Sequence, residues 1–232
     1  MENKTGNLFI HSFIDLFFPR SCNGCGNILS AREKVICGTC KLNLPKTSWQ
    51  NFKGNPLEKT FYGRVEVERA TSFLFFEKGG VVQNYLHNLK YKGQKQLGVI
   101  LGIYFGNDLL KSKWIKNIDL IVPIPLHSKK LKLRGYNQST MLAIGMAKAL
   151  KVPYSNKLLT RVRHTETQTL KDRFERQLNV KQAFKCEQTS SENILIVDDV
   201  STTGATFESA IQSIKKANPT CTIYVATLAI AN

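Results

Sequence analysis

Two adjacent aspartates and a glycine-containing run of hydroxyl residues follow one apolar stretch of the chain. The segment reads ILIVDDVSTTGAT and extends from Ile194 to Thr206. Ionised Asp198 and Asp199 can only accept hydrogen bonds, which suits a vicinal diol. Gly204 lets the backbone approach a ligand closely, and the free N–H groups at the start of a helix favour a phosphate. A sugar phosphate such as ribose 5-phosphate would satisfy both halves of the segment.

The candidate phosphate ligands belong to the loop that follows the aspartates. The loop residues are Ser201, Thr202, Thr203, Gly204, Ala205 and Thr206. A simpler interpretation is a helix N-cap, in which the acids and threonines only satisfy backbone N–H groups. Capping explains Asp199 or Thr203, but not two acids followed by four hydroxyls and a glycine, so we favour the sugar-phosphate site. The sequence has no Walker A loop and no strand followed by G-x-G-x-x-G, which argues against nucleoside triphosphates and dinucleotides.

Four cysteines near the start of the chain have the spacing of a metal site. They form two C-x-x-C pairs with 11 residues between the pairs: Cys22, Cys25, Cys37 and Cys40. Neighbouring glycines allow the tight turn in which backbone N–H groups point towards sulfur. Redox dithiols or disulfides are the alternatives, but disulfides are rare in cytoplasmic proteins. We predict a structural zinc ion with four thiolate ligands and no open coordination position.

The chain is strongly basic, with 33 Lys and Arg, 17 Asp and Glu, and a formal net charge of +16. Residues 121–190 hold 14 basic and 4 acidic side chains, a net charge of +10. Basic clusters gain affinity for polyanions by releasing counterions, so single-stranded DNA is a candidate partner. A solvated basic face is the alternative. The candidate anion contacts are Lys129, Lys130, Lys132, Arg134, Arg161, Arg163, Arg173 and Arg176.

Alternating strands and helices must position these groups. The sequence predicts strands at 69–77, 120–125, 194–199 and 221–230, and helices at 81–90, 95–111, 136–150 and 204–218. Near-continuous apolar strands between amphipathic helices indicate an α/β fold with a mostly parallel sheet covered on both faces. In such sheets, ligands bind beyond the carboxyl ends of the strands. We therefore expect the acid pair and its loop at one edge of the sheet.

The chain is expected to divide at about residue 50. Residues 1–50 combine a short helix over 9–17 with the cysteine segment, and residues 51–232 form the α/β domain. No apolar run approaches the roughly 20 residues that cross a bilayer, and a basic leader with a small-residue cleavage site is missing. We expect a cytoplasmic protein without a membrane span.

Three segments resemble, in order, the ComF family (also called ComFC/GntX-like) of type I phosphoribosyltransferase-like proteins. They are 121–139, 161–184 and 194–206, and the last is similar to the signature for 5-phosphoribosyl 1-pyrophosphate (PRPP). Only Ser201 departs from that signature, at a position where an aliphatic residue is commoner. The resemblance extends from the first cysteine to the last strand. It implies a sheet of the type I phosphoribosyltransferase type with a small N-terminal zinc-binding module.

The resemblance also implies roles for the segments. Asp198 and Asp199 would hold the ribose hydroxyls of PRPP, and residues 202–206 would hold its 5-phosphate. The loop after 120–125 would contact the pyrophosphate. The charged segment 161–184 has no long apolar stripe, and we expect it to be exposed and to fold over the site as a hood.

Three functions remain compatible with the sequence. The first is a Mg²⁺-dependent phosphoribosyltransferase in which Asp198 and Asp199 are catalytic and Mg²⁺ bridges the diphosphate. The second is a non-catalytic single-stranded DNA-binding protein, and the third is a PRPP-sensing regulator. The resemblance links the chain to DNA uptake in natural competence, with the competence machinery as a source of partners. No residues identify an acceptor base, so the alternatives stay open.

Overall fold

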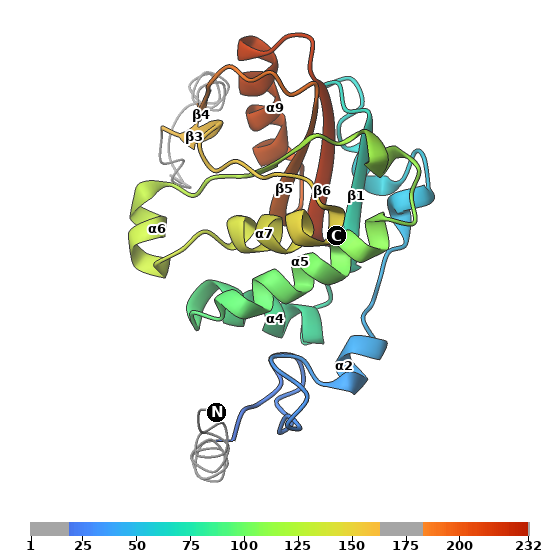
Figure 1. Ribbon diagram of the computed structural model, residues 1–232, viewed down its shortest axis with the longest axis vertical. Coiled ribbons are helices and arrows are strands. Elements are labelled where there is room, and N and C mark those ends of the chain that lie inside the picture. The colour runs from blue at the N-terminus through green and yellow to red at the C-terminus, as the bar shows by residue number, and fades with distance from the viewer. Residues whose placement is uncertain (1–18, 163–182, 232) are drawn as a thin grey trace, which may run out of the picture.

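A four-stranded parallel sheet forms the centre of the protein, which we describe from a computed structural model (Figure 1). The structure describes residues 19–162 and 183–231, so the helix expected over residues 9–17 lies outside them. The strands are ordered β1-β6-β5-β2, and each neighbouring pair is parallel. Their bounds are β1 Arg69–Phe75, β2 Leu120–Pro123, β5 Asn193–Ser201 and β6 Thr222–Ile230. The predicted mostly parallel α/β fold is confirmed.

Helices cover both faces of the sheet because the strands bury side chains on both sides. The main helices are α4 Val81–Tyr91, α5 Lys95–Leu109, α7 Gln138–Leu150 and α9 Ala205–Ala217. In β5, Leu195 and Val197 join the core that includes α4, α5 and α7, whereas Ile194 and Ile196 join the core beneath α9. This alternation follows from the two-residue period of a strand. It fixes β5 in the middle layer of a three-layer structure.

A second, two-stranded sheet is not predicted by the sequence. β3 Leu159–Arg161 pairs antiparallel with β4 Phe184–Cys186, and Thr160 lies opposite Lys185. Each strand has only three residues, which is too short for an alternating pattern to be recognised. The pairing brings together the two ends of the charged segment 161–184, of which residues 163–182 lie outside the described part of the chain.

The basic segment after β2 is a helix, not the loop that the sequence analysis expected. α6 covers Ser128–Arg134, and the Nδ1 atom of His127 accepts a hydrogen bond from the Lys129 N–H (3.3 Å). Lysine, leucine and arginine favour a helix, and Gly135 ends it with a left-handed φ of 73°. The other short helices are α2 Gly38–Leu42, α3 Pro56–Lys59, and the 3₁₀ helices η1 Trp49–Asn51 and η2 Trp114–Asn117.

The cysteine segment packs against α4 at the end of the molecule remote from α9 (Figure 1). Asn84 Nδ2 donates to the carbonyl of Gly24 (2.7 Å), and Asn88 Nδ2 donates to that of Asn23 (3.1 Å). The buried apolar residues of the segment belong to the same cluster as α4 and α5. Among the described helices, none has the length and apolar character needed to cross a membrane.

Candidate functional site

The two aspartates lie on β5 just past the end of β2. The last residue of β2, Pro123, is opposite Val197, whereas β6 continues beside β5 as far as Ser201. Within the described residues, one side of β5 therefore has no strand partner at Asp198 and Asp199. Their carboxylates lie towards the carboxyl end of the sheet, where α/β proteins bind ligands.

Each aspartate uses one carboxylate oxygen for contacts within the protein. Asp198 Oδ1 accepts hydrogen bonds from Ser139 Oγ (2.7 Å) and from the Asp199 N–H (2.9 Å). Asp199 Oδ2 forms an ion pair with Lys90 Nζ (3.1 Å). Neither Asp198 Oδ2 nor Asp199 Oδ1 has a hydrogen-bond partner among the described residues. As far as the described residues go, one acceptor oxygen on each aspartate thus remains for a ligand that donates two hydrogen bonds.

The environment of Asp198 favours its protonated form more than usual. Burial and then the charge of Asp199 raise the pKa of Asp198 to about 7, against the effects of Ser139, the Asp199 N–H and Lys90. Two neighbouring carboxylates resist joint ionisation unless positive charge or hydrogen-bond donors offset the repulsion. Asp198 therefore changes its protonation state near neutral pH, and the pair is suited to a ligand that supplies hydroxyl donors or is accompanied by a cation.

The loop after β5 leads directly into α9. Gly204 is the N-cap of α9, has a left-handed φ of 73°, and is buried against Phe61. Glu208 N–H makes the first bond of the helix, to the Gly204 carbonyl (2.9 Å), so the N–H groups of residues 205–207 have no backbone acceptor in the described part of the chain and can bind an anion. Four loop residues are exposed: Thr202, Thr203, Ala205 and Thr206. Backbone donors and threonine hydroxyls therefore meet at one exposed turn.

Ser201 is placed differently from the other predicted loop residues. Its side chain is only 3% exposed, at the end of the β5–β6 pairing opposite Ile230. Its hydroxyl has no hydrogen-bond partner among the described residues. This burial agrees with the aliphatic residue that is commoner at the position, and it keeps the Ser201 hydroxyl out of solvent.

Arg64, which is distant from the loop in sequence, holds the loop by side-chain hydrogen bonds. Its Nη1 donates to the carbonyls of Thr203 (2.8 Å) and Thr60 (3.0 Å), and its guanidinium forms an ion pair with Glu208 on α9. Arg64 lies 139 residues before Thr203, so no local pattern in the sequence predicts this contact. It fixes the loop backbone at the residue before Gly204.

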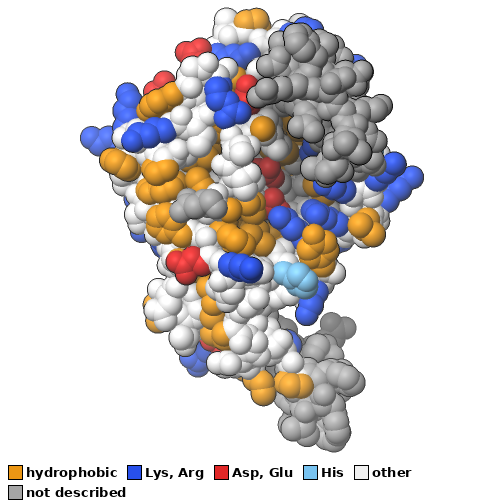
Figure 2. Space-filling model, turned by 180° about the vertical axis from the view of Figure 1, so that it is seen from behind, with side chains coloured by type: hydrophobic (Ala, Val, Ile, Leu, Met, Phe, Trp, Pro, Cys, Tyr) orange, Lys and Arg blue, Asp and Glu red, His pale blue; other side chains and the backbone are white. Residues whose placement is uncertain are grey.

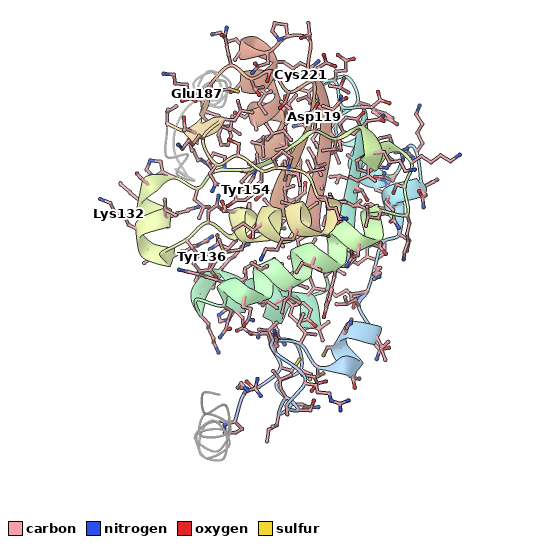
Figure 3. The ribbon with its side chains drawn as sticks, viewed as in Figure 1. Asp119, Lys132, Tyr136, Tyr154, Glu187 and Cys221 are labelled. Carbon is pink, nitrogen blue, oxygen red and sulfur yellow. The ribbon has the colours of Figure 1, made fainter. Side chains whose placement is uncertain are left out.

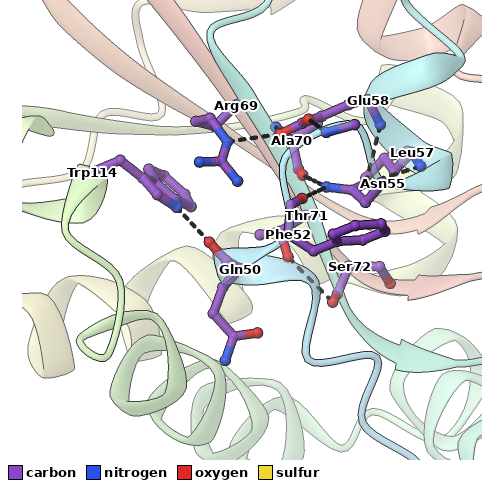
Figure 4. A network of polar contacts seen from close by, with 11 residues as sticks. Gln50, Phe52, Asn55, Leu57, Glu58, Arg69, Ala70, Thr71, Ser72 and Trp114 are labelled. Carbon is purple, nitrogen blue, oxygen red and sulfur yellow. Dashed lines mark hydrogen bonds and ion pairs between the residues drawn. The ribbon is translucent and has the colours of Figure 1, made fainter.

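A buried polar network positions the segment that carries Arg64 (Figure 4). Asn55 Oδ1 caps α3 by accepting from the N–H groups of Leu57 and Glu58 (3.0 and 3.1 Å), and its amide donates to the Ala70 carbonyl (2.7 Å). Glu58 Oε1 accepts from Arg69 Nε (2.8 Å) and from the Ala70 N–H (3.2 Å). Because Arg69 and Ala70 belong to β1, these bonds fix α3 to the sheet. The turn that follows α3 then lies against the loop after β5.

The basic residues of α6 divide into two kinds. Lys129, Lys130 and Lys132 are exposed, and Lys132 lies on the outer side of the helix (Figure 3). Arg134 instead donates to Gln138 Oε1 (2.8 Å) and stacks over the Tyr91 ring (5.5 Å) at the end of α4. Figure 2 shows basic side chains grouped beside acidic ones near the middle of one face, with further basic side chains along its margin.

Among the arginines of segment 161–184, the structure describes only Arg161. Arg161 stacks over Phe184 (5.3 Å), and burial lowers its pKa while the charge of Asp198 opposes that shift. Arg161 therefore lies close enough to Asp198 for their charges to interact. Arg163, Arg173 and Arg176 lie outside the described residues.

The four cysteines come together as the spacing predicts. The sulfur atoms of Cys22, Cys25, Cys37 and Cys40 all lie within 4.8 Å of one another. Zinc–sulfur bonds of about 2.3 Å in a tetrahedron place sulfurs about 3.8 Å apart, and the Cys25 and Cys37 sulfurs are separated by 3.7 Å. The cluster is therefore positioned to bind a metal ion and fits zinc.

Backbone N–H groups point at the sulfurs in the way that a thiolate cluster requires. Cys22 Sγ accepts from the N–H groups of Gly24 (3.4 Å) and Cys37 (3.3 Å), and Cys37 Sγ accepts from that of Cys40 (3.4 Å). Burial opposes ionisation, yet these bonds lower the pKa of Cys22 to about 7. Burial and the neighbouring thiols raise the pKa of Cys40. Four adjacent thiols cannot all ionise without a cation, which a bound metal ion would supply.

Three site residues escaped the sequence analysis: Ser139, Lys90 and Arg64. Each reaches the site from a helix or turn that lies far from β5 in sequence. Ser139 lies two residues after Asn137, whose side chain caps α7 by accepting from the Ser139 N–H (3.2 Å). That cap is the one local signal, since it places Ser139 at a helix start.

Comparisons with known proteins find similar chains among proteins of two bacteria. No family model matches it. Competence protein F of Haemophilus influenzae is 25% identical over 214 residues, covering 86% of this chain and 93% of that protein. DNA utilization protein YhgH of Salmonella typhimurium is 32% identical over 189 residues, covering 80% of this chain and 73% of that protein. A solved structure of glutamine PRPP amidotransferase from B. subtilis, complexed with ADP and GMP, is 19% identical with a TM-score of 0.35, covering 59% of this chain and 26% of that chain.

Proposed function

Because the chain belongs to the ComF family, together with competence protein F and DNA utilization protein YhgH, we propose that it binds PRPP at the carboxyl end of β5. One observation carries the proposal. A carboxylate pair with one available oxygen on each aspartate directly precedes a helix N-terminus with exposed N–H and hydroxyl donors. A ribose 5-phosphate has a diol at one end and a phosphate at the other, so one molecule satisfies both features.

In this proposal the aspartates and the loop have separate roles. Asp198 Oδ2 and Asp199 Oδ1 accept hydrogen bonds from the ribose hydroxyls. The N–H groups of residues 205–207 and the hydroxyls of Thr202, Thr203 and Thr206 bind the 5-phosphate. Arg64 keeps the loop in the shape that this contact requires, because it holds the Thr203 carbonyl.

The same arrangement supports phosphoribosyl transfer. An acceptor nitrogen would attack the ribose C1 as pyrophosphate leaves, through a transition state in which the ring gains positive charge. Asp198 and Asp199 would stabilise that charge, while Mg²⁺ would neutralise the diphosphate oxygens. Arg161 supplies positive charge near Asp198, and Arg134 lies against Tyr91 at the end of α4.

Calorimetric titration of PRPP with Mg²⁺ tests the binding site. Asp198→Asn and Asp199→Asn remove a charge at almost constant shape, and each should weaken binding by about 1.5–3 kcal/mol, or roughly ten- to a hundredfold. Thr203→Val removes one loop hydroxyl at similar volume. The matched control is Asp119→Asn, because Asp119 also accepts backbone N–H bonds (3.0 and 3.1 Å) but lies at the amino end of β5 (Figure 3). No binding by wild type at millimolar PRPP would refute the proposal.

We further propose that the protein acts in DNA uptake during natural competence and contacts single-stranded DNA and the competence machinery. The names of the two relatives and the three exposed lysines of α6 favour this role. Single-stranded DNA affinity should fall with salt by a slope near −0.7 per phosphate neutralised. Replacing Lys129, Lys130 and Lys132 by alanine should flatten that slope. An affinity for single-stranded DNA that does not change with salt concentration would contradict this electrostatic role of the lysines.

A regulatory role follows if PRPP changes DNA affinity without being consumed. Measuring DNA binding with and without PRPP, together with PRPP consumption over a panel of acceptors, separates the enzyme from the sensor. We also propose that the cysteine module holds a structural zinc ion and that the protein acts in the cytoplasm, where thiols stay reduced.

A further inference from the structure

Lys90 at the end of α4 is directed at the acid pair. Its ammonium lies 3.1 Å from Asp199 Oδ2, and the side chains of Lys90 and Asp199 are 23% and 13% exposed. Exposed lysines normally lie in solvent, where an ion pair contributes little. This pair is mostly enclosed, so its electrostatic effect on the site is larger than that of a surface pair.

The backbone that carries Lys90 is held in place. The Tyr136 hydroxyl donates to the Leu89 carbonyl, and the Leu89 side chain is fully buried. Lys95 packs its ammonium over the Tyr136 ring (5.5 Å). Lys90 therefore extends from a fixed helix end, so its ammonium is positioned before any ligand arrives.

The charges around the aspartates explain why such a lysine matters. Asp198 interacts with Asp199 on its own strand, Ser139 on α7, Lys90 on α4 and Arg161 on β3. Burial and the Asp199 charge disfavour the ionised form of Asp198, and the charge of Lys90 opposes them. Only an ionised carboxylate offers all its lone pairs to hydroxyl donors.

We propose that Lys90 is a positioning residue of the sugar site: it fixes the Asp199 carboxylate and favours the ionised form of Asp198, so that both aspartates accept hydrogen bonds from the ligand. The inference rests on the proposed PRPP site. It assigns to α4 a role in ligand binding that neither the signature nor the basic segments of the sequence suggest.

The test compares three variants over a range of pH. Lys90→Gln removes the charge, Lys90→Arg keeps it, and Lys92→Gln removes an equal charge from an exposed residue at the end of the same helix. PRPP affinity with Mg²⁺ is measured by calorimetry from pH 6 to pH 9. The phosphates of PRPP titrate in the same way in every experiment. Their contribution to the pH dependence therefore cancels when wild type and the variants are compared.

Lys90→Gln should raise the pH midpoint of PRPP binding by about one unit and weaken binding about tenfold at pH 7. Lys90→Arg and Lys92→Gln should keep the wild-type midpoint. A Lys90→Gln variant that melts at a lower temperature but keeps the wild-type midpoint would show a merely structural ion pair and overturn the inference.

A ligand-free measurement separates this inference from the proposed function. Carboxyl ¹³C NMR follows the titration of Asp198 in wild type and in Lys90→Gln without PRPP. We expect the midpoint to be higher in the variant, and an unchanged midpoint overturns the role of Lys90 whether or not PRPP binds. Failure of wild type to bind PRPP would refute the proposed function alone.

Discussion

Replacing Gly204 by alanine tests whether the loop before α9 is held in one conformation against the turn after α3. An alanine with a φ of 73° costs about 1–2 kcal/mol in left-handed backbone strain. Its Cβ would also lie 3.0 Å from Phe61 Cε1 and 3.1 Å from Thr60 Oγ1. Phe61 is buried and Thr60 Oγ1 donates to the Leu57 carbonyl (2.8 Å), so neither neighbour moves freely. Overpacking adds about 1–3 kcal/mol, and we expect a total loss of about 2–5 kcal/mol in the free energy of unfolding.

Gly135→Ala is the matched control for this experiment. Gly135 also has a φ of 73°, but nothing lies within 4 Å of a Cβ built there. The free energy of unfolding of Gly135→Ala should therefore fall only by the backbone strain of about 1–2 kcal/mol. The difference between the two variants then measures the contact with Phe61. Urea unfolding gives both values. The contact is confirmed further if Phe61→Leu lowers the free energy of unfolding by less in the Gly204→Ala background than in wild type.

Two results would refute the reasoning about the loop. Equal losses for Gly204→Ala and Gly135→Ala would show that the loop moves away from Phe61 without cost. Unchanged PRPP affinity in a folded Gly204→Ala variant would show that the phosphate contact does not depend on close backbone approach at this residue.

The remaining predictions concern the metal, a buried hydroxyl and pH. Elemental analysis of wild type purified without added metal should find about one zinc per chain, and Cys37→Ser should lose that zinc. Metal removal should unfold residues 1–50 before the larger domain, as measured by hydrogen exchange. Ser201→Ala should raise the free energy of unfolding by about 1 kcal/mol, because it removes a buried hydroxyl without a partner among the described residues. Since the pKa of Asp198 is raised to about 7, its stabilising protonated form is complete below about pH 4 and is lost as the pH rises to 7. Without ligand, wild type should lose stability relative to Asp198→Asn across that window, and parallel melting curves would contradict the assignment.

The sequence predicts the sheet and main helices well because their patterns are long. β5 and β6 are nearly continuous apolar runs, and α9 has an apolar stripe at helical spacing. Each of these patterns extends over a full element and is therefore recognisable in the sequence. β3 and β4 were missed because three-residue strands contain no measurable period. The prediction of a loop at α6 is wrong because a run of charges is also compatible with a helix: Lys and Leu favour one, and Gly135 marks its end.

The site shows the same division between local and long-range information. The acid pair, the glycine loop and the cysteine spacing are local in sequence, and each could be predicted from residue types alone. Lys90 and Arg64 could not, because each depends on where the folded chain places a distant helix end or turn. The burial of Ser201 could not be predicted either, because it depends on β6 continuing beside β5 past the end of β2.

Helix α4 contacts both the cysteine module and the proposed sugar site. Asn84 and Asn88 bind the first C-x-x-C turn, and Lys90 binds Asp199. The 11 residues of α4 extend about 16 Å, so one rigid element connects two sites that are separate in sequence and chemistry. If zinc occupancy shifts α4 and thereby changes the affinity for PRPP, thermodynamic linkage requires PRPP to change the affinity for zinc by the same factor. Zinc supply and the supply of an activated sugar would then be sensed through one helix, in either direction.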